Sequence, residues 1–296
     1  MRTTSRHQPQ TPSFGRTRLR LGFSECPNDC AVFHALVHDE ALTDLSFEVV
    51  FADVEALNAM ALADELDVAK VSYRAAARLL PRWGLLRSGG ALGRGVGPLV
   101  VTRDELPDLS GRSVAVPGAL TTATLLLRLA APAARVTVLR YDRIMPAVAA
   151  GEVEAGLIIH ESRFTYARHG LRLHADLGAW WESLTGELIP LGAIAVRRDL
   201  PQPVQRELAR AVRASVQSFF DDPEASTAFV AEHAQEMDPA VRAEHIALYV
   251  NRYTLDVGEA GERAVARLLA EARRLDGLGA EAADPFSGAA REPCEA

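Results

Sequence analysis

The chain has 296 residues, of which 48% are hydrophobic and 24% are charged, and its formal net charge is −7. This length exceeds what one hydrophobic core usually supports, so we expect two lobes. The acidic balance argues against an extended phosphate-binding surface, and no apolar stretch reaches the roughly 18 residues that suggest a membrane span.

The two ends of the chain are expected to be disordered. Residues 1–17 are polar and lack the apolar stretch of a secretory signal, so they are interpreted as a disordered leader. Residues 281–296 are interpreted as a disordered tail. The three cysteines, two of them four residues apart, form no disulfide framework, which favours a cytoplasmic location.

Between the two ends, short apolar runs alternate with stretches of helical pattern as far as Arg197. Strands are predicted at 19–23, 47–53, 67–73, 113–118, 136–141 and 155–160, and helices at 29–38 and 54–63. This alternation predicts an α/β protein whose parallel sheets are covered on both faces. Four further helices are predicted after Asp199, at 202–220, 223–235, 239–250 and 258–275.

The middle of the chain predicts how the lobes connect. Residues 97–118 hold two strand-like runs around a polar segment, which indicates a crossover, and residues 191–200 are the expected return. Lobe one would then be residues 18–102 plus 198–280, and lobe two residues 103–197. Two crossovers are typical of a hinged cleft binder, whose ligand lies beyond the carboxyl ends of the strands.

The first strand is followed by SECPNDC (24–30), which opens a helix. Asn28 or Asp29 can cap that helix and leave its free N–H groups facing a ligand, although an ordinary strand-to-helix turn is the favoured interpretation.

A stripe of possible metal ligands runs along the same helix. Cys26, Cys30, His34 and His38 recur every four residues. Thiolate and imidazole are zinc ligands, but this spacing matches no zinc pattern, so a buried or half-buried helix face is favoured over a metal site.

Two later stretches could bind an anion. RSGGALGRGVGP (87–98) is rich in glycine but lacks the P-loop lysine and the GxGxxG pattern, so a flexible turn and a mobile cleft-edge segment both stay open. In PGALTTATLLLRL (117–129), Thr121 or Thr122 can cap a helix and direct its amides at an anion; a plain cap is the alternative.

GLIIHESRFTY (156–166) is an apolar strand that ends abruptly in polar side chains. The imidazole of His160 can take a proton near neutral pH, and Glu161 could orient it. A structural histidine at a strand end is the alternative. Ser162 is not in a GxSxG motif, which argues against a serine hydrolase. Arg163 is expected to support this loop rather than pair with an acid of the other lobe.

Taken together, these stretches resemble the 1,4-dihydroxy-6-naphthoate synthase family. The resemblance extends from residue 24 to residue 198 and is carried by SECPND, KVSY, LLRSGGALGRGVGPLVV, VAVPGALTTATLLLRL, GLIIHESRFTY and PLGAIAVRR. It implies a two-lobed type II periplasmic-binding-protein-like fold with a hinged cleft and extra C-terminal helices. It also implies a carbon–carbon lyase that converts cyclic dehypoxanthinyl futalosine to 1,4-dihydroxy-6-naphthoate in the futalosine route to menaquinone.

The resemblance further implies the residues of the site. The family's catalytic histidine falls on His160 as general base, with a covalent nucleophile left open. The expected substrate contacts fall on Lys70, Ser72, Ser88, Gly89, Thr121 and Thr122, with the substrate carboxylate on the Thr121–Thr122 helix start. No metal or organic cofactor is implied. The expected partner is a small-molecule substrate, not a nucleic acid or a membrane, and a homodimer stays open.

The chain departs from the family pattern at two positions, Glu25 and Cys30, where the family usually has proline and threonine. We expect Glu25 to point to solvent, because an acid facing the site would repel a carboxylate. Two other functions stay open. One is the sibling enzyme that dehydrates chorismate, and the other is a non-catalytic solute-binding protein, against which the missing signal peptide argues.

Overall fold

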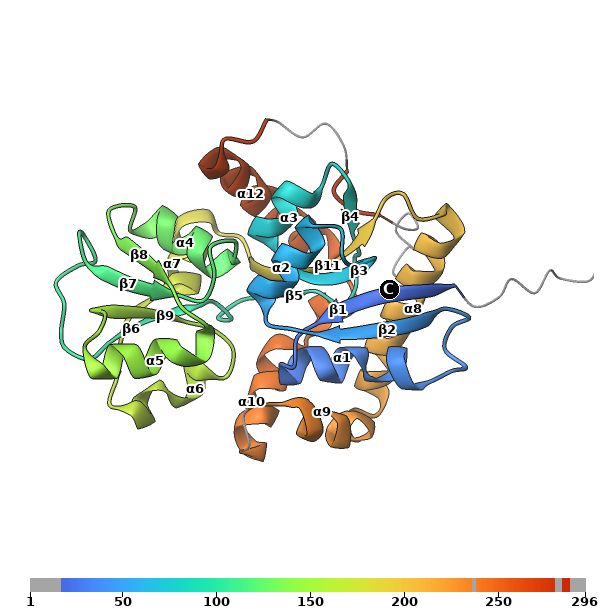
Figure 1. Ribbon diagram of the computed structural model, residues 1–296, viewed down its shortest axis with the longest axis horizontal. Coiled ribbons are helices and arrows are strands. Elements are labelled where there is room, and N and C mark those ends of the chain that lie inside the picture. The colour runs from blue at the N-terminus through green and yellow to red at the C-terminus, as the bar shows by residue number, and fades with distance from the viewer. Residues whose placement is uncertain (1–16, 236–237, 280–283, 288–296) are drawn as a thin grey trace, which may run out of the picture.

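Two sheets, each covered by helices, form the molecule in a computed structural model that describes residues 17–235, 238–279 and 284–287 (Figure 1). The first sheet lies to the right in Figure 1 and the second to the left. The predicted leader, apart from residue 17, and most of the predicted tail lie outside the described residues.

The first sheet has the strand order β2-β1-β3-β11-β4, and β5 also pairs with β11. Its strands are β1 (Arg18–Phe23), β2 (Ser46–Phe51), β3 (Val68–Ser72), β4 (Trp83–Leu85), β5 (Ala91–Gly93) and β11 (Ile189–Arg197). β1 is parallel to β2 and β3, whereas β11 is antiparallel to β3, β4 and β5. Every residue of β3 is buried, as expected of a central strand covered on both faces.

The second sheet has the strand order β10-β6-β9-β7-β8. Its strands are β6 (Leu99–Thr102), β7 (Ser113–Val116), β8 (Arg135–Val138), β9 (Ala155–Ile158) and β10 (Arg172–Asp176). β7 is parallel to β8 and β9, and β6 is antiparallel to β9 and β10. Both sheets are therefore mixed and not wholly parallel as predicted, because the strands beside the two crossovers run against their neighbours.

The helices cover the sheets and lie close to their predicted positions. They are α1 (Pro27–His38), α2 (Val54–Leu62), α3 (Tyr73–Leu79), α4 (Thr122–Ala130), α5 (Tyr141–Ala150), α6 (Ser162–Thr165), α7 (Leu177–Thr185), α8 (Gln202–Asp221), α9 (Thr227–His233), α10 (Pro239–Tyr249), α11 (Arg252–Leu255) and α12 (Gly258–Asp276), with short 3-10 turns at Tyr166–His169 and Pro223–Ser226. α1 packs against α8, α9 and α10, and α12 packs against α3. The C-terminal helices thus complete lobe one.

Hydrogen bonding between strands places the two crossovers earlier than the predicted lobe boundaries. β5, which ends at Gly93, belongs to the first sheet, and β6, which begins at Leu99, already belongs to the second. The return lies between Thr185 and Ile189, because β11 pairs with β3 in the first sheet. An apolar run such as Leu99–Thr102 can be buried in either sheet. The boundary is therefore decided by the strand with which the run pairs, and the sequence does not show that partner.

Part of the predicted tail is ordered against lobe one. Pro285 accepts a backbone hydrogen bond from Leu85 of β4, and Ser287 donates one back to it, both at 2.8 Å. The guanidinium of Arg87 lies 4.5 Å from the ring centre of Phe286. For residues 284–287 the expected disorder is therefore wrong, because pairing with an edge strand and partial burial of the Phe286 ring offset the entropy of ordering.

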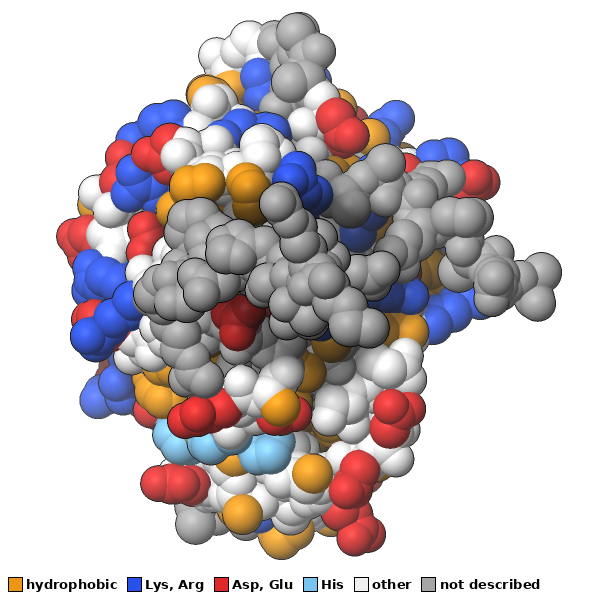
Figure 2. Space-filling model, turned by 90° about the vertical axis from the view of Figure 1, so that its right-hand side faces the viewer, with side chains coloured by type: hydrophobic (Ala, Val, Ile, Leu, Met, Phe, Trp, Pro, Cys, Tyr) orange, Lys and Arg blue, Asp and Glu red, His pale blue; other side chains and the backbone are white. Residues whose placement is uncertain are grey.

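The surface carries charges of both signs. Figure 2 shows acidic and basic side chains interspersed over one face, with no continuous basic area among its coloured side chains. Within the part of the chain that the structure describes, no helix is long and apolar enough to cross a membrane.

Candidate active site

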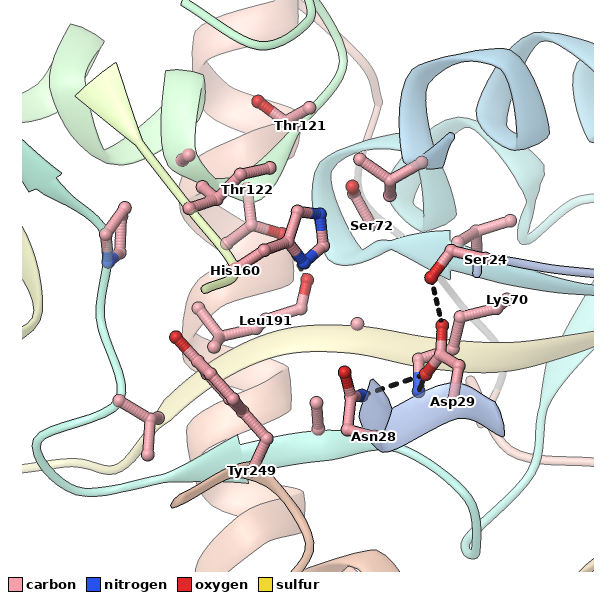
Figure 3. Close-up of a pocket in the computed structure, with 18 of the residues that line it drawn as sticks. Ser24, Asn28, Asp29, Lys70, Ser72, Thr121, Thr122, His160, Leu191 and Tyr249 are labelled. Carbon is pink, nitrogen blue, oxygen red and sulfur yellow. Dashed lines mark hydrogen bonds and ion pairs between the residues drawn. The ribbon is translucent and has the colours of Figure 1, made fainter. Parts of the chain in front are cut away.

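A cavity with an empty volume of about 720 Å³ lies between the two lobes and has polar groups from both (Figure 3). Of the predicted site residues, it brings together Lys70 and Ser72 from the end of β3, Thr121 and Thr122 from the start of α4, and His160 beyond β9. These side chains follow the carboxyl ends of strands in both sheets, where ligands bind in open α/β folds.

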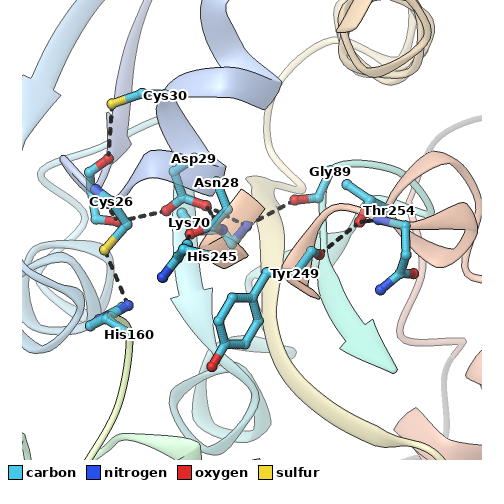
Figure 4. Close-up of polar contacts among 12 residues, drawn as sticks. Cys26, Asn28, Asp29, Cys30, Lys70, Gly89, His160, His245, Tyr249 and Thr254 are labelled. Carbon is cyan, nitrogen blue, oxygen red and sulfur yellow. Dashed lines mark hydrogen bonds and ion pairs between the residues drawn. The ribbon is translucent and has the colours of Figure 1, made fainter. Parts of the chain in front are cut away.

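The wall formed by lobe one holds a buried ion pair. Lys70 Nζ lies 2.8 Å from Asp29 Oδ1 and also donates to the carbonyl of Gly89 at 2.9 Å. The Asp29 carboxylate accepts two more hydrogen bonds, from the Ser24 hydroxyl at 2.7 Å and from the Asn28 amide at 2.9 Å (Figure 4). A buried charge is tolerated when it is paired and its remaining lone pairs are satisfied, so this network is a fixed polar surface for a ligand.

The same network reaches α10. His245 Nε2 lies 2.8 Å from Asn28 Oδ1, and the ring of Tyr249, one turn further along the helix, is 4.7 Å from the His245 ring. Both side chains are buried and line the cavity.

His160 is held quite differently, by lobe two and one contact across the cleft. Its backbone has φ +55°, a left-handed conformation that is uncommon outside glycine and is often found at functional sites. Nδ1 lies 3.1 Å from the Cys26 sulfur, at the start of α1, and the ring packs edge-on against Tyr141 at 5.4 Å. The sequence led us to expect Glu161 as the group that orients the ring. In the structure, the partner of Nδ1 is instead the Cys26 thiol.

Burial sets the charge of this thiol–imidazole pair. It lowers the pKa of His160, which the neighbouring Glu161 carboxylate only partly opposes. Burial, together with Glu161 and Asp29, raises the pKa of the Cys26 thiol well above its ordinary value. Near neutral pH the pair is therefore a neutral imidazole beside a neutral thiol, and Nε2 remains for the cavity.

The start of α4 offers backbone amides instead of hydroxyls. Thr121 is the N-cap, as predicted, and its Oγ1 accepts a hydrogen bond from the Thr124 amide at 3.1 Å. The Thr122 hydroxyl donates to the Leu191 carbonyl at 2.7 Å and accepts from the Tyr73 amide at 3.0 Å. Both hydroxyls are thus engaged within the protein. What remains at this helix start is the positive end of the helix dipole and its first free N–H groups.

Ser88 and Gly89 do not line the cavity. The Ser88 hydroxyl donates to the Leu255 carbonyl at 2.7 Å, and the Gly89 amide donates to Thr254 at 2.7 Å. A side chain at Gly89, whose φ is +81°, would also meet Ile194 at 2.8 Å. The glycine therefore supports Lys70 from behind through its carbonyl.

Two other expectations concern charges near the cleft. Arg163 donates to the Gly97 carbonyl at 2.7 Å and lies 3.8 Å from Asp176 at the end of β10, contacts that hold the loop after His160, and it also lies near Tyr249 of lobe one. Glu25 is only partly exposed and lines a smaller cavity beside the main one, so it is turned away from the main cavity but is not fully in solvent.

Sequence reasoning missed the roles of Asn28, Asp29, His245 and Tyr249. It considered Asn28 and Asp29 as caps, but α1 begins at Pro27 with Cys26 at its N-cap, which places both side chains inside the first turn. Two polar residues in the buried first turn of a helix were the available signal. For His245 and Tyr249 the only signal was their spacing of four, which puts them on one helix face.

The Cys26–His38 stripe is a helix face. Cys26 and Cys30 are buried unpaired cysteines, His34 is partly buried and His38 is exposed. Among the residues that the structure describes, no group of three or more histidine, cysteine or acidic side chains is arranged to hold a metal ion.

The chain is similar to known proteins over nearly its whole length. A family model described as "Menaquinone biosynthesis" matches residues 19–274. A 1,4-dihydroxy-6-naphthoate synthase of Thermus thermophilus is 55% identical over 268 residues, which cover 90% of this chain and 98% of the relative. One from Streptomyces coelicolor is 52% identical over 260 residues, covering 86% and 92%.

Solved structures agree on the fold. A protein from Archaeoglobus fulgidus aligns with a TM-score of 0.83 at 35% identity, covering 88% of this chain and 98% of that one. An alkanesulfonate-binding protein of Xanthomonas axonopodis aligns with a TM-score of 0.63 at 17% identity, covering 80% and 86%. The second likeness bears on the fold alone, and with the two sheets it confirms the two-lobed periplasmic-binding-protein-like architecture.

Proposed function

The chain belongs to the menaquinone-biosynthesis family, and on that premise we propose that His160 is the general base of its reaction. Its sequence is 55% and 52% identical to those of two 1,4-dihydroxy-6-naphthoate synthases. It is therefore an enzyme of the same kind, a lyase of menaquinone biosynthesis. The substrate we assign to it is cyclic dehypoxanthinyl futalosine.

The observation that best supports this role is the protonation and hydrogen bonding of the His160 imidazole. Its pKa is lowered by burial, and Nδ1 is occupied by the Cys26 sulfur at 3.1 Å. The thiol can accept the Nδ1 proton in a hydrogen bond, which leaves a lone pair on Nε2 to take a proton from the substrate. Removal of that proton leaves an electron pair that drives bond cleavage, and aromatisation of the second ring supplies the driving force.

The carboxylate of the substrate is proposed to rest on the start of α4. Two features support this: the free N–H groups of the first turn, and Ala123 and Thr122 among the cavity-lining residues. The Ser72 hydroxyl accepts a hydrogen bond from the Asn58 side-chain amide at 3.3 Å. Its own proton is therefore available for a hydrogen bond to an oxygen of the ligand.

Contacts between the lobes would exclude water during the reaction. Thr122 of lobe two bridges Tyr73 and Leu191 of lobe one, and the Arg74 guanidinium donates to the Ala119 carbonyl at 2.7 Å. Opening and closing of these contacts is the proposed route for substrate entry.

We also propose that the enzyme works in the cytoplasm on a small-molecule substrate. The buried cysteines Cys26 and Cys30 are both unpaired, which supports a reducing compartment.

The test is product formation. The purified protein is mixed with cyclic dehypoxanthinyl futalosine, and separately with chorismate, and the naphthoate chromophore is followed for wild type, His160→Ala and the control His169→Ala, whose side chain is exposed. We expect naphthoate from wild type and control, and a loss of about 10²- to 10⁴-fold in His160→Ala.

The other outcomes each reject one part of the proposal. Equal rates in wild type and His160→Ala would remove His160 from its role while keeping the enzyme assignment. Dehydration of chorismate without naphthoate formation would identify the sibling enzyme instead. Binding without turnover of either compound would indicate a solute-binding protein.

A further inference from the structure

His245 is a buried histidine of the cavity that the mechanism above does not use. Its side chain is 0% exposed, and its Nδ1 has no hydrogen-bond partner among the described residues. A buried polar atom without a partner costs about 1–3 kcal/mol, so such an atom in a cavity wall calls for an explanation.

The neighbouring network fixes which nitrogen of His245 carries the proton. The Asp29 carboxylate only accepts hydrogen bonds, so the Asn28 group that faces it at 2.9 Å is the NH₂ group. The other end of that amide, its carbonyl oxygen, therefore faces His245 at 2.8 Å. An oxygen acceptor requires Nε2 of His245 to be the donor.

The charge of His245 follows from its surroundings. Burial is the main cause that lowers its pKa well below the ordinary value, and the nearby His160 and Arg163 lower it further. The ring is therefore neutral at neutral pH, with its single proton on Nε2. Nδ1 is then an unprotonated nitrogen, an acceptor that cannot donate.

His245 lies close to His160, the proposed base. A substrate group bound to His245 would therefore also be close to His160. The two imidazole rings are 6.3 Å apart and nearly parallel, and both line the main cavity. Figure 4 shows them on the same side of the Asn28–Asp29 helix start.

We propose that, when the lobes open and close around the substrate, Nδ1 of His245 accepts a hydrogen bond from a hydroxyl group in the sugar-derived part of the substrate and thereby positions it beside His160. A bare lone pair attracts a donor and repels a carboxylate, so His245 and the start of α4 select opposite ends of one ligand. This role rests on the proposed function, since it assumes a hydroxylated substrate in this cavity.

Two isosteric variants separate this role from a structural one. In His245→Asn, the side-chain oxygen can occupy the place of Nδ1, while the bond to Asn28 is lost. In His245→Gln, the side-chain NH₂ can replace Nε2 and keep the bond to Asn28, while the acceptor at Nδ1 is lost. Thermal stability and the steady-state KM and kcat for cyclic dehypoxanthinyl futalosine are measured for both.

We expect His245→Gln to be the more stable variant and yet to raise KM about tenfold, whereas His245→Asn stays within about threefold of wild type. If KM instead follows stability, with His245→Gln the better of the two, the residue is structural and the proposal is wrong.

A ligand-free measurement keeps the proposal testable if either variant fails to fold. In wild type labelled with ¹⁵N-histidine, the Nδ1 resonance of His245 is expected at the position of an unprotonated nitrogen at neutral pH, and it should shift when the substrate binds. A protonated Nδ1 in the free protein would overturn the proposal without touching the enzyme assignment, which the product assay decides separately.

Discussion

The two walls of the cavity hold their polar groups in opposite ways. In lobe one, Asp29 and Lys70 are buried and paired, and they are also hydrogen-bonded by Ser24, Asn28 and the Gly89 carbonyl. In lobe two, His160 has a left-handed backbone, and the hydrogen-bond partner of its imidazole ring among the described residues is a thiol from the other lobe. A buried, paired network is suited to holding a ligand, and an imidazole held by one side-chain contact is suited to exchanging a proton.

The largest effect is expected when the lobe-one wall is broken. Asp29→Asn removes the partner of a buried ammonium and should cost about 3–5 kcal/mol of unfolding free energy. Denaturant unfolding measures this loss. Asp104→Asn, which breaks an exposed pair with Arg103, is the control and should cost less than about 1 kcal/mol. Equal losses in the two variants would mean that the buried network is not a stabilising unit.

A smaller effect is expected when the contact across the cleft is removed. Cys26→Ala takes away the partner of His160 Nδ1, so the ring loses its fixed orientation, and kcat should fall about tenfold with little change in KM. Cys30→Ala is the matched control, because Cys30 is buried on the same helix without touching His160. It should reduce stability but leave kcat unchanged, and a similar fall of kcat in both variants would argue against positioning by Cys26.

The smallest expected effect concerns acid stability. His160 and His245 have lowered pKa values in the folded protein, with burial as the main cause. Below the ordinary histidine pKa of about 6.5, the unfolded chain therefore binds more protons than the folded one, and stability falls as pH decreases. The midpoint of thermal unfolding should drop between about pH 7 and pH 5, and the drop should be shallower in His245→Gln. An unchanged slope in that variant would mean that His245 is not buried in its neutral form.

The sequence predicted the second wall better than the first. His160 could be located because an apolar run ends abruptly in polar side chains, and Thr121 because helix caps have a local signature. The lobe-one network joins Asn28 to His245, which are 217 residues apart, and the Cys26–His160 contact spans 134 residues. Periodicity does not report such pairings.

The same limit explains the other differences. Ser88 and Gly89 belong to a stretch that carries the family resemblance, yet they serve the site from behind, through hydrogen bonds to α11 and to Lys70. The observed lobe boundaries differ from the predicted ones for a related reason, because the sequence of an apolar strand does not show which sheet the strand joins.

The pH dependence of kcat/KM, in wild type and in His160→Gln, tests the central claim most directly. If His160 takes the proton, wild-type kcat/KM should fall on the acid side with an apparent pKa below about 6.5, because a protonated imidazole accepts no proton. The much slower residual reaction of His160→Gln should lack this acid limb. The same limb in both enzymes, at similar rates, would assign the proton transfer to another group and contradict the account.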